Sequence, residues 1–192
     1  FDLYDLAPVG YCTLSEKGLI LEANLTAATL LGVARGALVK QPLTRFILHE
    51  DQDIYYRHRK LLFETGAPQV YELRLVKKDG AQVWAHIQAT AAQDGESRRV
   101  CRVVLSDITE RKQAEEKLKD TLESLRKAVN TTIQVMVAAV ETRDPYTAGH
   151  QIRSANLARA IATEMGLPQE KIDAIRMAGS IHDIGKLSIP AE

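Results

Sequence analysis

The residues best suited to chemistry form the segment 182–186, with the sequence HDIGK. Imidazole and carboxylate groups suit a divalent ion that acts on phosphate, and Lys186 offers a point charge to a phosphate oxygen. A further histidine, His150, precedes them on what we predict is the neighbouring helix. We therefore predict that His150, His182 and Asp183 contribute to one metal site. On spacing alone, the alternative of core histidines without a metal stays open.

Two helices must position these ligands. Asp144 and Pro145 favour a helix start, since proline is tolerated at the first helical position, and we expect that helix to run to about Met165. A further helix is predicted over 169–184. His150 lies seven residues before Leu157, a spacing that returns to the same helix face. We expect both histidines to point inward, together with the apolar residues Leu157, Ala158, Ile161, Ala162 and Met165 of the first helix and Ile172, Ile175 and Ala178 of the second.

Composition excludes some classes of function. The 25 basic and 25 acidic residues balance, so no overall field points to nucleic acid or to a membrane surface. The longest purely apolar run, 135–140, is far too short to span a bilayer. Cys12 and Cys101 lie in apolar strand-like contexts and are predicted to be buried free thiols, which favours a reducing cytoplasm.

The first part of the chain, 1–109, predicts an α+β domain. Apolar and charged residues alternate with period two in 71–75, as in a half-buried strand, and Asp79-Gly80 suits the hairpin turn that follows. Asn24 is a good N-cap for a short helix, and residues 50–64 read as a longer one. We predict a five-stranded antiparallel sheet with helices on one face. The predicted strands are 10–14, 19–23, 71–75, 83–89 and 100–105.

A long helix over about 110–141 is predicted next. It carries apolar or small residues at alternating spacings of four and three, which is the heptad pattern of a coiled coil. Since such a helix has no core of its own, we expect a parallel homodimer through the first domain and residues 110–139; the alternative is a solvated linker that packs on its own domain. The seam comprises Leu118, Leu122, Leu125, Val129, Thr132, Met136 and Ala139.

Four features in residues 5–113 resemble the PAS sensory domain: Ala23-Asn24, the segment 49–51, the segment 77–80 and the exit 107–109. The resemblance implies a sensor that binds haem, flavin or a small metabolite, or a relay that only dimerises. No cysteine lies in the helix after the second strand, which argues against flavin–cysteine photochemistry, and the ligand stays unknown. His58 has charged neighbours and is expected on a solvated face, which argues against haem.

Where the last strand becomes the long helix, Asp107 and Thr109 are predicted to relay the signal. Short polar side chains at such a point bond neighbouring backbone groups.

The segment 144–150 with Arg153, followed by 182–186 and Ile189-Pro190, resembles the opening of an HD-GYP domain, a phosphodiesterase branch of the HD superfamily. The resemblance implies that His150, His182 and Asp183 bind iron, manganese or a similar divalent metal. It also implies that Lys186 contacts a phosphate of the substrate, cyclic di-GMP. The family's Gly-Tyr-Pro signature and its later ligands do not occur in 130–192, so we expect an incomplete HD-GYP segment and an inactive chain.

Together these features predict a cytoplasmic sensor–effector with a PAS domain at 1–109, a coiled-coil linker at 110–129 and the HD-GYP segment at 130–192. Two alternatives remain open. In the first, the chain is a non-enzymatic dimeric sensing module with a remnant helical tail. In the second, its HD segment acts on another nucleotide or has an inactive regulatory role.

Overall fold

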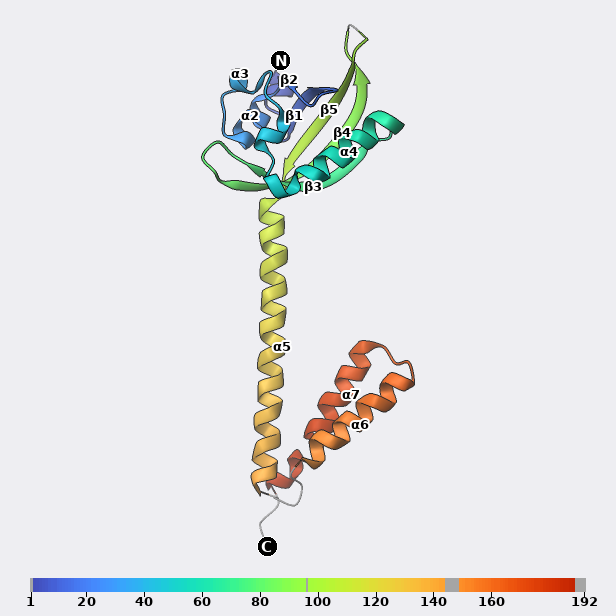
Figure 1. Ribbon diagram of the computed structural model, residues 1–192. Coiled ribbons are helices and arrows are strands. Elements are labelled where there is room, and N and C mark those ends of the chain that lie inside the picture. Colours follow the sequence, from blue (N-terminus) through green and yellow to red (C-terminus); the bar gives the residue numbers. More distant parts are fainter. Residues whose placement is uncertain (1, 96, 144–148, 189–192) are drawn as a thin grey trace. The chain divides into compact units, whose positions relative to one another are not determined.

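The computed structural model describes residues 2–95, 97–143 and 149–188 (Figure 1). The chain divides into two compact units, an N-terminal unit of residues 1–116 and a C-terminal unit of residues 117–192. Within the described ranges, every helix is too short or too polar to cross a bilayer.

A five-stranded antiparallel sheet forms the centre of the N-terminal unit, as predicted. Its spatial order is β2-β1-β5-β4-β3, and each neighbouring pair is antiparallel. The first and last strands therefore lie side by side in the middle of the sheet. The strands are β1 (Gly10–Ser15), β2 (Ile20–Ala23), β3 (Gln69–Val76), β4 (Gln82–Gln93) and β5 (Arg99–Asp107).

The two faces of the sheet differ as the period-two pattern requires. On β4, Val83, Ala85 and Ile87 are buried, whereas Trp84 is half-buried on the opposite face. The buried face packs against short helices and one longer helix to form a single hydrophobic core. These helices are α2 (Leu25–Leu31), α3 (Arg35–Leu38) and α4 (Gln52–Thr65), with 3-10 segments at Leu43–Phe46 and His49–Asp51. The short helix α1 (Asp2–Asp5) lies outside this core, and the ring of its Tyr4 stacks on Tyr11 of β1 with 5.8 Å between centroids.

Asn24 is the predicted N-cap of α2, and it uses both ends of its fully buried amide. Its Oδ1 accepts hydrogen bonds from the backbone N–H groups of Ala27 and Tyr11, each at 2.9 Å. Its Nδ2 donates to the carbonyl oxygens of Tyr4 at 2.8 Å and Val9 at 3.0 Å. One side chain thus joins α1, β1 and the start of α2, which explains why an amide is tolerated in the core.

Cys12 and Cys101 are buried free thiols, as predicted. They lie on the inner face of the neighbouring strands β1 and β5. Burial raises the pKa of both thiols to about 12, because a thiolate loses its solvation there. Both therefore behave as small apolar core residues.

The prediction that His58 lies on a solvated face is wrong. His58 is half-buried on α4, its ring stacks on Tyr71 with 4.4 Å between centroids, and its Nδ1 lies 2.9 Å from Gln69 Oε1. It follows the buried Tyr55 by three residues and precedes the buried Leu62 by four, so helical geometry turns it toward β3. Its charged sequence neighbours point elsewhere.

The long helix α5 (Thr109–Arg143) begins in the N-terminal unit and continues into the C-terminal one. The C-terminal unit also contains α6 (His150–Glu164), α7 (Gln169–Ile181) and a 3-10 segment, Ile184–Ser188. The predicted Asp144-Pro145 helix start lies outside the described residues, as does Ile189-Pro190.

Helices α6 and α7 pack side by side (Figure 1). Gly179 makes this approach possible, because a Cβ atom there would lie 3.1 Å from the Cα atom of Ala155. Small residues thus determine how closely α6 and α7 approach.

The predicted inner face of α6 is largely wrong. Leu157, Ile161 and Met165 are 64%, 52% and 68% exposed. The close approach of α7 at Ala155 rotates these larger residues outward. The side chains that α6 buries are Gln151, Ala155 and Ala162. On α7, Ile172 is buried and Ile175 half-buried as predicted, but Ala178 is exposed.

Candidate metal centre and signal junction

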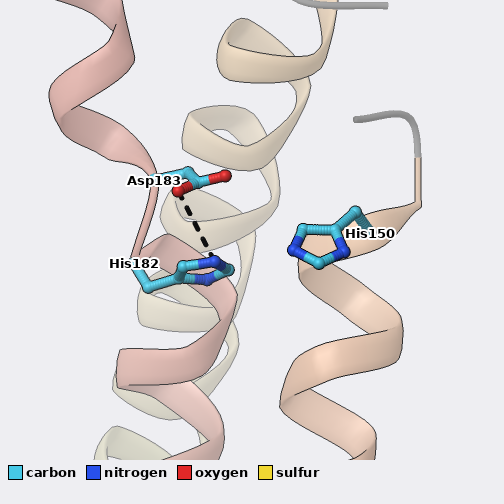
Figure 2. A group of neighbouring side chains, drawn as sticks. All are labelled: His150, His182 and Asp183. Atoms are coloured by element: carbon cyan, nitrogen blue, oxygen red, sulfur yellow. Dashed lines mark ion pairs between the residues drawn. The ribbon is translucent and has the colours of Figure 1, made fainter. Parts of the chain in front are cut away.

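The structure brings the three predicted metal ligands together (Figure 2). His150 is the first residue of α6, and His182 and Asp183 directly follow the last residue of α7. Their ligand atoms all lie within 4.8 Å of one another, and the two imidazole centroids are 5.6 Å apart. Both histidines are exposed and Asp183 is half-buried, so the prediction of inward-pointing histidines is wrong although they meet as expected.

The donor set fits a divalent ion. His182 Nδ1 lies 2.8 Å from the carbonyl oxygen of Gly179, so the tautomer that donates there leaves the lone pair of Nε2 free for a metal. Ligands bound at about 2.1 Å stand at most about 4.2 Å apart. Small side-chain rotations therefore suffice to direct His150, His182 and Asp183 at one ion.

Lys186 lies beside this cluster. Its Nζ is 2.9 Å from Asp183 Oδ2. This hydrogen bond is the main reason why the pKa of Asp183 is below its usual range, with smaller electrostatic contributions from His182 and His150. The carboxylate is therefore ionised at neutral pH, which is the state that binds a metal.

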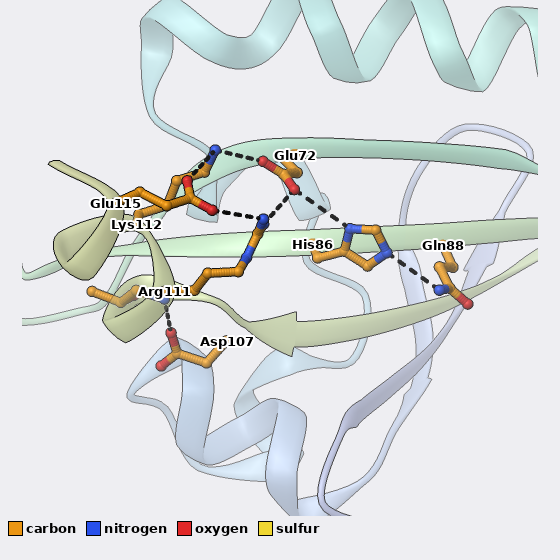
Figure 3. A network of polar contacts seen from close by, with 8 residues as sticks. Glu72, His86, Gln88, Asp107, Arg111, Lys112 and Glu115 are labelled. Atoms are coloured by element: carbon orange, nitrogen blue, oxygen red, sulfur yellow. Dashed lines mark hydrogen bonds and ion pairs between the residues drawn. The ribbon is translucent and has the colours of Figure 1, made fainter. Parts of the chain in front are cut away.

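The predicted relay residues Asp107 and Thr109 lie where β5 becomes α5, and Figure 3 shows Asp107 at this point. Asp107 Oδ1 accepts a hydrogen bond from the Thr109 N–H at 2.8 Å. Thr109 Oγ1 in turn accepts from the Trp84 N–H at 3.0 Å, and the Ile108 N–H donates to the Trp84 carbonyl oxygen at 2.9 Å. The first turn of the long helix is thereby bonded to β4.

The sequence reasoning missed a second connection, centred on Glu72 of β3 (Figure 3). Glu72 Oε1 accepts from Arg111 Nη2 at 2.5 Å, and Glu72 Oε2 lies 2.8 Å from Lys112 Nζ. Hydrogen bonds lower the pKa of Glu72, the larger effect coming from Lys112 and the smaller from Arg111, so the carboxylate is ionised. His86 extends the network, with Nδ1 3.8 Å from Glu72 Oε1. Strand alternation places Glu72 on the polar face, but its partners depend on how α5 leaves the sheet.

Trp84 lies between two cations on the same face. Lys112 Nζ is 5.2 Å from its ring centroid, and the Arg74 guanidinium is 5.6 Å away. Arg74 is held by Asp51, whose carboxylate accepts from the backbone N–H, Nε and Nη2 of Arg74 at 2.7, 3.0 and 2.7 Å. Polar and aromatic contacts therefore run from the start of α4 to the start of α5.

Comparison with known families agrees with these features. Residues 8–110 match the family model of the PAS domain, and residues 147–192 match that of the HD domain. Over 76 residues the chain is 30% identical to the cyclic di-GMP phosphodiesterase response regulator RpfG of Xanthomonas campestris pv. campestris (strain 8004). That match covers 40% of this chain and 20% of RpfG, so the chain spans about a fifth of that relative's length.

Solved PAS domains have the same fold as the N-terminal unit. The PAS domain of a Colwellia psychrerythraea protein superimposes with a TM-score of 0.52 at 18% identity, covering 57% of this chain and 93% of that one. The PAS domain of an HTR-like protein from Haloarcula marismortui gives 0.50 at 18% identity, covering 56% and 87%.

Proposed function

Because this chain belongs to the PAS domain family and an HD domain match follows its sensor, we propose that it is a sensor–effector in which the PAS domain regulates an HD-GYP phosphodiesterase. The proposed substrate is cyclic di-GMP, the molecule in the name of the relative RpfG. The observation that carries the proposal is the cluster of His150, His182 and Asp183 within 4.8 Å, inside the HD match.

In this proposal the PAS sensor comprises residues 1–109, the coiled-coil linker 110–129 and the HD-GYP segment 130–192. The PAS ligand is unknown. The two buried free thiols accord with a reducing compartment, and we propose a cytoplasmic protein.

At the HD-GYP segment, His150, His182 and Asp183 hold a divalent ion, iron, manganese or a similar metal. A bound ion of this kind lowers the pKa of water and neutralises charge on a phosphodiester. The residues of the chain have separate tasks. The Gly179 carbonyl fixes the His182 tautomer, Asp183 supplies negative charge, and Lys186 stabilises a substrate phosphate oxygen. Three protein ligands suffice for one ion, whereas a binuclear centre needs more.

The proposed assembly is a parallel homodimer through the PAS domain and residues 110–139. Its support is an exposed apolar stripe on α5 at heptad spacing, because exposed leucines at every helical turn favour pairing with an identical helix. Signal passes from the sheet through Asp107 and Thr109 to this seam. The stripe includes Leu118 at 61%, Leu122 at 51%, Leu125 at 59% and Val129 at 37% exposure.

Metal binding by the 192-residue chain tests the proposal. Titration with Mn²⁺ should give one bound ion per copy, and His150→Ala or His182→Ala should each abolish most of the binding. His49→Ala, which removes an imidazole from the N-terminal unit, is the matched control and should bind as the parent chain does. We expect cyclic di-GMP to remain intact in all four samples, since one ion with three ligands does not make a binuclear centre.

Failure of the parent chain to bind metal would favour the second candidate, a non-enzymatic dimeric PAS relay. Turnover of cyclic di-GMP would contradict the expected inactivity. The dimer is tested separately by light scattering, where Leu122→Lys should convert a dimer to a monomer and the exposed, off-seam change Lys119→Ala should not. A monomeric parent chain would overturn the coiled-coil proposal.

A further inference from the structure

Glu141, near the end of α5, makes an unusual contact with the helix that carries His150. Its Oε1 accepts a hydrogen bond from the backbone N–H of Gly149 at 2.5 Å. Gly149 directly precedes His150 and is the N-cap of α6. Both Glu141 and Gly149 are half-buried. The contact thus spans the connection between α5 and α6 and ends one residue before a proposed metal ligand.

The conformation of Gly149 explains why this contact comes from outside α6. Its φ is +70°, a value that favours glycine, and a Cβ atom there would lie 2.8 Å from Arg153 Nη1. The position therefore has no side chain with which to cap the helix. Its carbonyl oxygen accepts the Arg153 N–H at 3.0 Å, which leaves its own N–H without a partner in α6. In the usual capping box, a glutamate within the same helix binds the N-cap N–H. Here a glutamate from the preceding helix does this.

The carboxylate of Glu141 fixes the first turn of α6 in two ways. It accepts from an N–H group that has no partner within the helix, and its negative charge lies at the positive end of the helix dipole. The end of α5 that carries Glu141 is anchored by Val137 and Val140, which are 6% and 1% exposed. A displacement at the end of α5 is therefore transmitted to the backbone that orients His150.

We propose that Glu141 is a positioning residue for the metal ligand His150, and that through it the signalling helix acts on the metal site. This inference rests on the proposed metal-binding function. Glu141 is separate from the ligand cluster, which among the described residues comprises His150, His182 and Asp183. Contacts that orient a metal-bound histidine typically change metal affinity about 10- to 100-fold when removed.

The test compares Glu141→Ala, Glu141→Gln and a control, Glu123→Ala. Glu123 lies on the same helix and pairs with Lys127 at 2.8 Å on an exposed surface. Titration with Co²⁺ alone gives the affinity, and its visible absorption reports the ligand geometry. We expect Glu141→Ala to weaken binding by about 10-fold or more and to alter the Co²⁺ spectrum. Glu141→Gln keeps an acceptor oxygen and should recover most of the affinity, while Glu123→Ala should match the parent chain.

Amide hydrogen exchange without metal provides a second readout. In Glu141→Ala, exchange should accelerate at residues 149–153 and remain unchanged in α7. If the parent chain binds Co²⁺ and Glu141→Ala binds equally well, the positioning role is overturned while the metal site stands. A parent chain that does not bind Co²⁺ overturns both. If the alanine variant loses helicity, Glu141→Gln decides: a well-folded glutamine variant whose exchange accelerates at residues 149–153 while its Co²⁺ affinity is unchanged would overturn the proposal.

Discussion

The N-terminal and C-terminal units bury apolar surface to very different extents. The sheet and helices of the N-terminal unit share a core in which Leu14, Leu73 and Leu105 are at most 1% exposed. In the C-terminal unit, α6 exposes Leu157 and Met165 by more than half. The first unit closes its core with its own residues, whereas the second presents apolar surface for further contacts. The unit with the complete core is the sensor, and the unit with open faces carries the proposed chemistry.

The largest difference is expected from truncating leucines in the two units. Leu73→Ala should lower the free energy of unfolding of the N-terminal unit by about 2–5 kcal/mol, because it leaves a cavity in a closed core. Leu157→Ala, its matched change on α6, should alter stability by less than about 0.5 kcal/mol. Urea denaturation followed by the fluorescence of Trp84, the single tryptophan, reports the first unit, and circular dichroism reports the helices. A comparable loss of unfolding free energy in both variants would contradict the difference in core packing between the two units.

Buried amides sharpen the same comparison. Asn24 is fully bonded, whereas the amide atoms of Gln151, which is fully buried, have no hydrogen-bond partner among the described residues. Asn24→Ala should therefore destabilise its unit by about 2–3 kcal/mol, through loss of the cap and of two buried carbonyl partners. Gln151→Met keeps the volume without an unpaired amide and should be neutral or stabilise by up to about 1 kcal/mol. Thermal unfolding measures both, and a destabilised Gln151→Met would show that the amide is bonded in solution.

The link between Asp51 and Arg74 predicts how stability depends on pH. The hydrogen bond from Arg74 is the largest cause of the lowered pKa of Asp51. A lowered pKa in the folded state adds stability that is complete above the unfolded value of about 3.9 and is lost as the pH falls through the folded value. Asp51→Asn should cost about 1–3 kcal/mol at pH 7 and less at pH 3. Asp53→Asn, at an exposed site in the first turn of α4, is the control. Equal losses at both pH values would contradict the ion pair as the cause.

The sequence predicted the N-terminal unit better than the C-terminal one for a physical reason. Period-two alternation, the Asp79-Gly80 turn and the capping preference of asparagine report local geometry, and they sufficed for five strands and the Asn24 cap. They failed for His58, where a helix turned a histidine with charged neighbours toward Tyr71. On α6 the larger apolar residues suggested the inner face, but the contact at Gly179 gave that face to small residues.

For the candidate site too, the sequence indicated the residues but not the contacts that depend on how the helices are placed. Residue types and motif spacing indicated His150, His182 and Asp183, and helix ends bring them together. The contacts of Glu72 and Glu141 could not be predicted, because each depends on where a helix starts relative to a residue outside that helix. A glycine at an N-cap position was the one available signal for Glu141, since it implies a cap from elsewhere.

The smallest effect on stability, and the most direct test of how the two units communicate, concerns the start of α5. Glu72 is partly exposed and its ion pairs are screened by solvent, so Glu72→Gln should cost less than about 1 kcal/mol in Trp84-detected unfolding. Its effect on hydrogen exchange should be larger and local, with faster exchange at residues 109–113, as in Asp107→Ala. Glu64→Gln, which breaks the exposed pair with Lys60, should leave those amides unchanged. If Glu72→Gln leaves exchange at the start of α5 unaltered while Asp107→Ala raises it, the bonds of Asp107, Ile108 and Thr109 hold the helix, and the Glu72 carboxylate has no part in the relay.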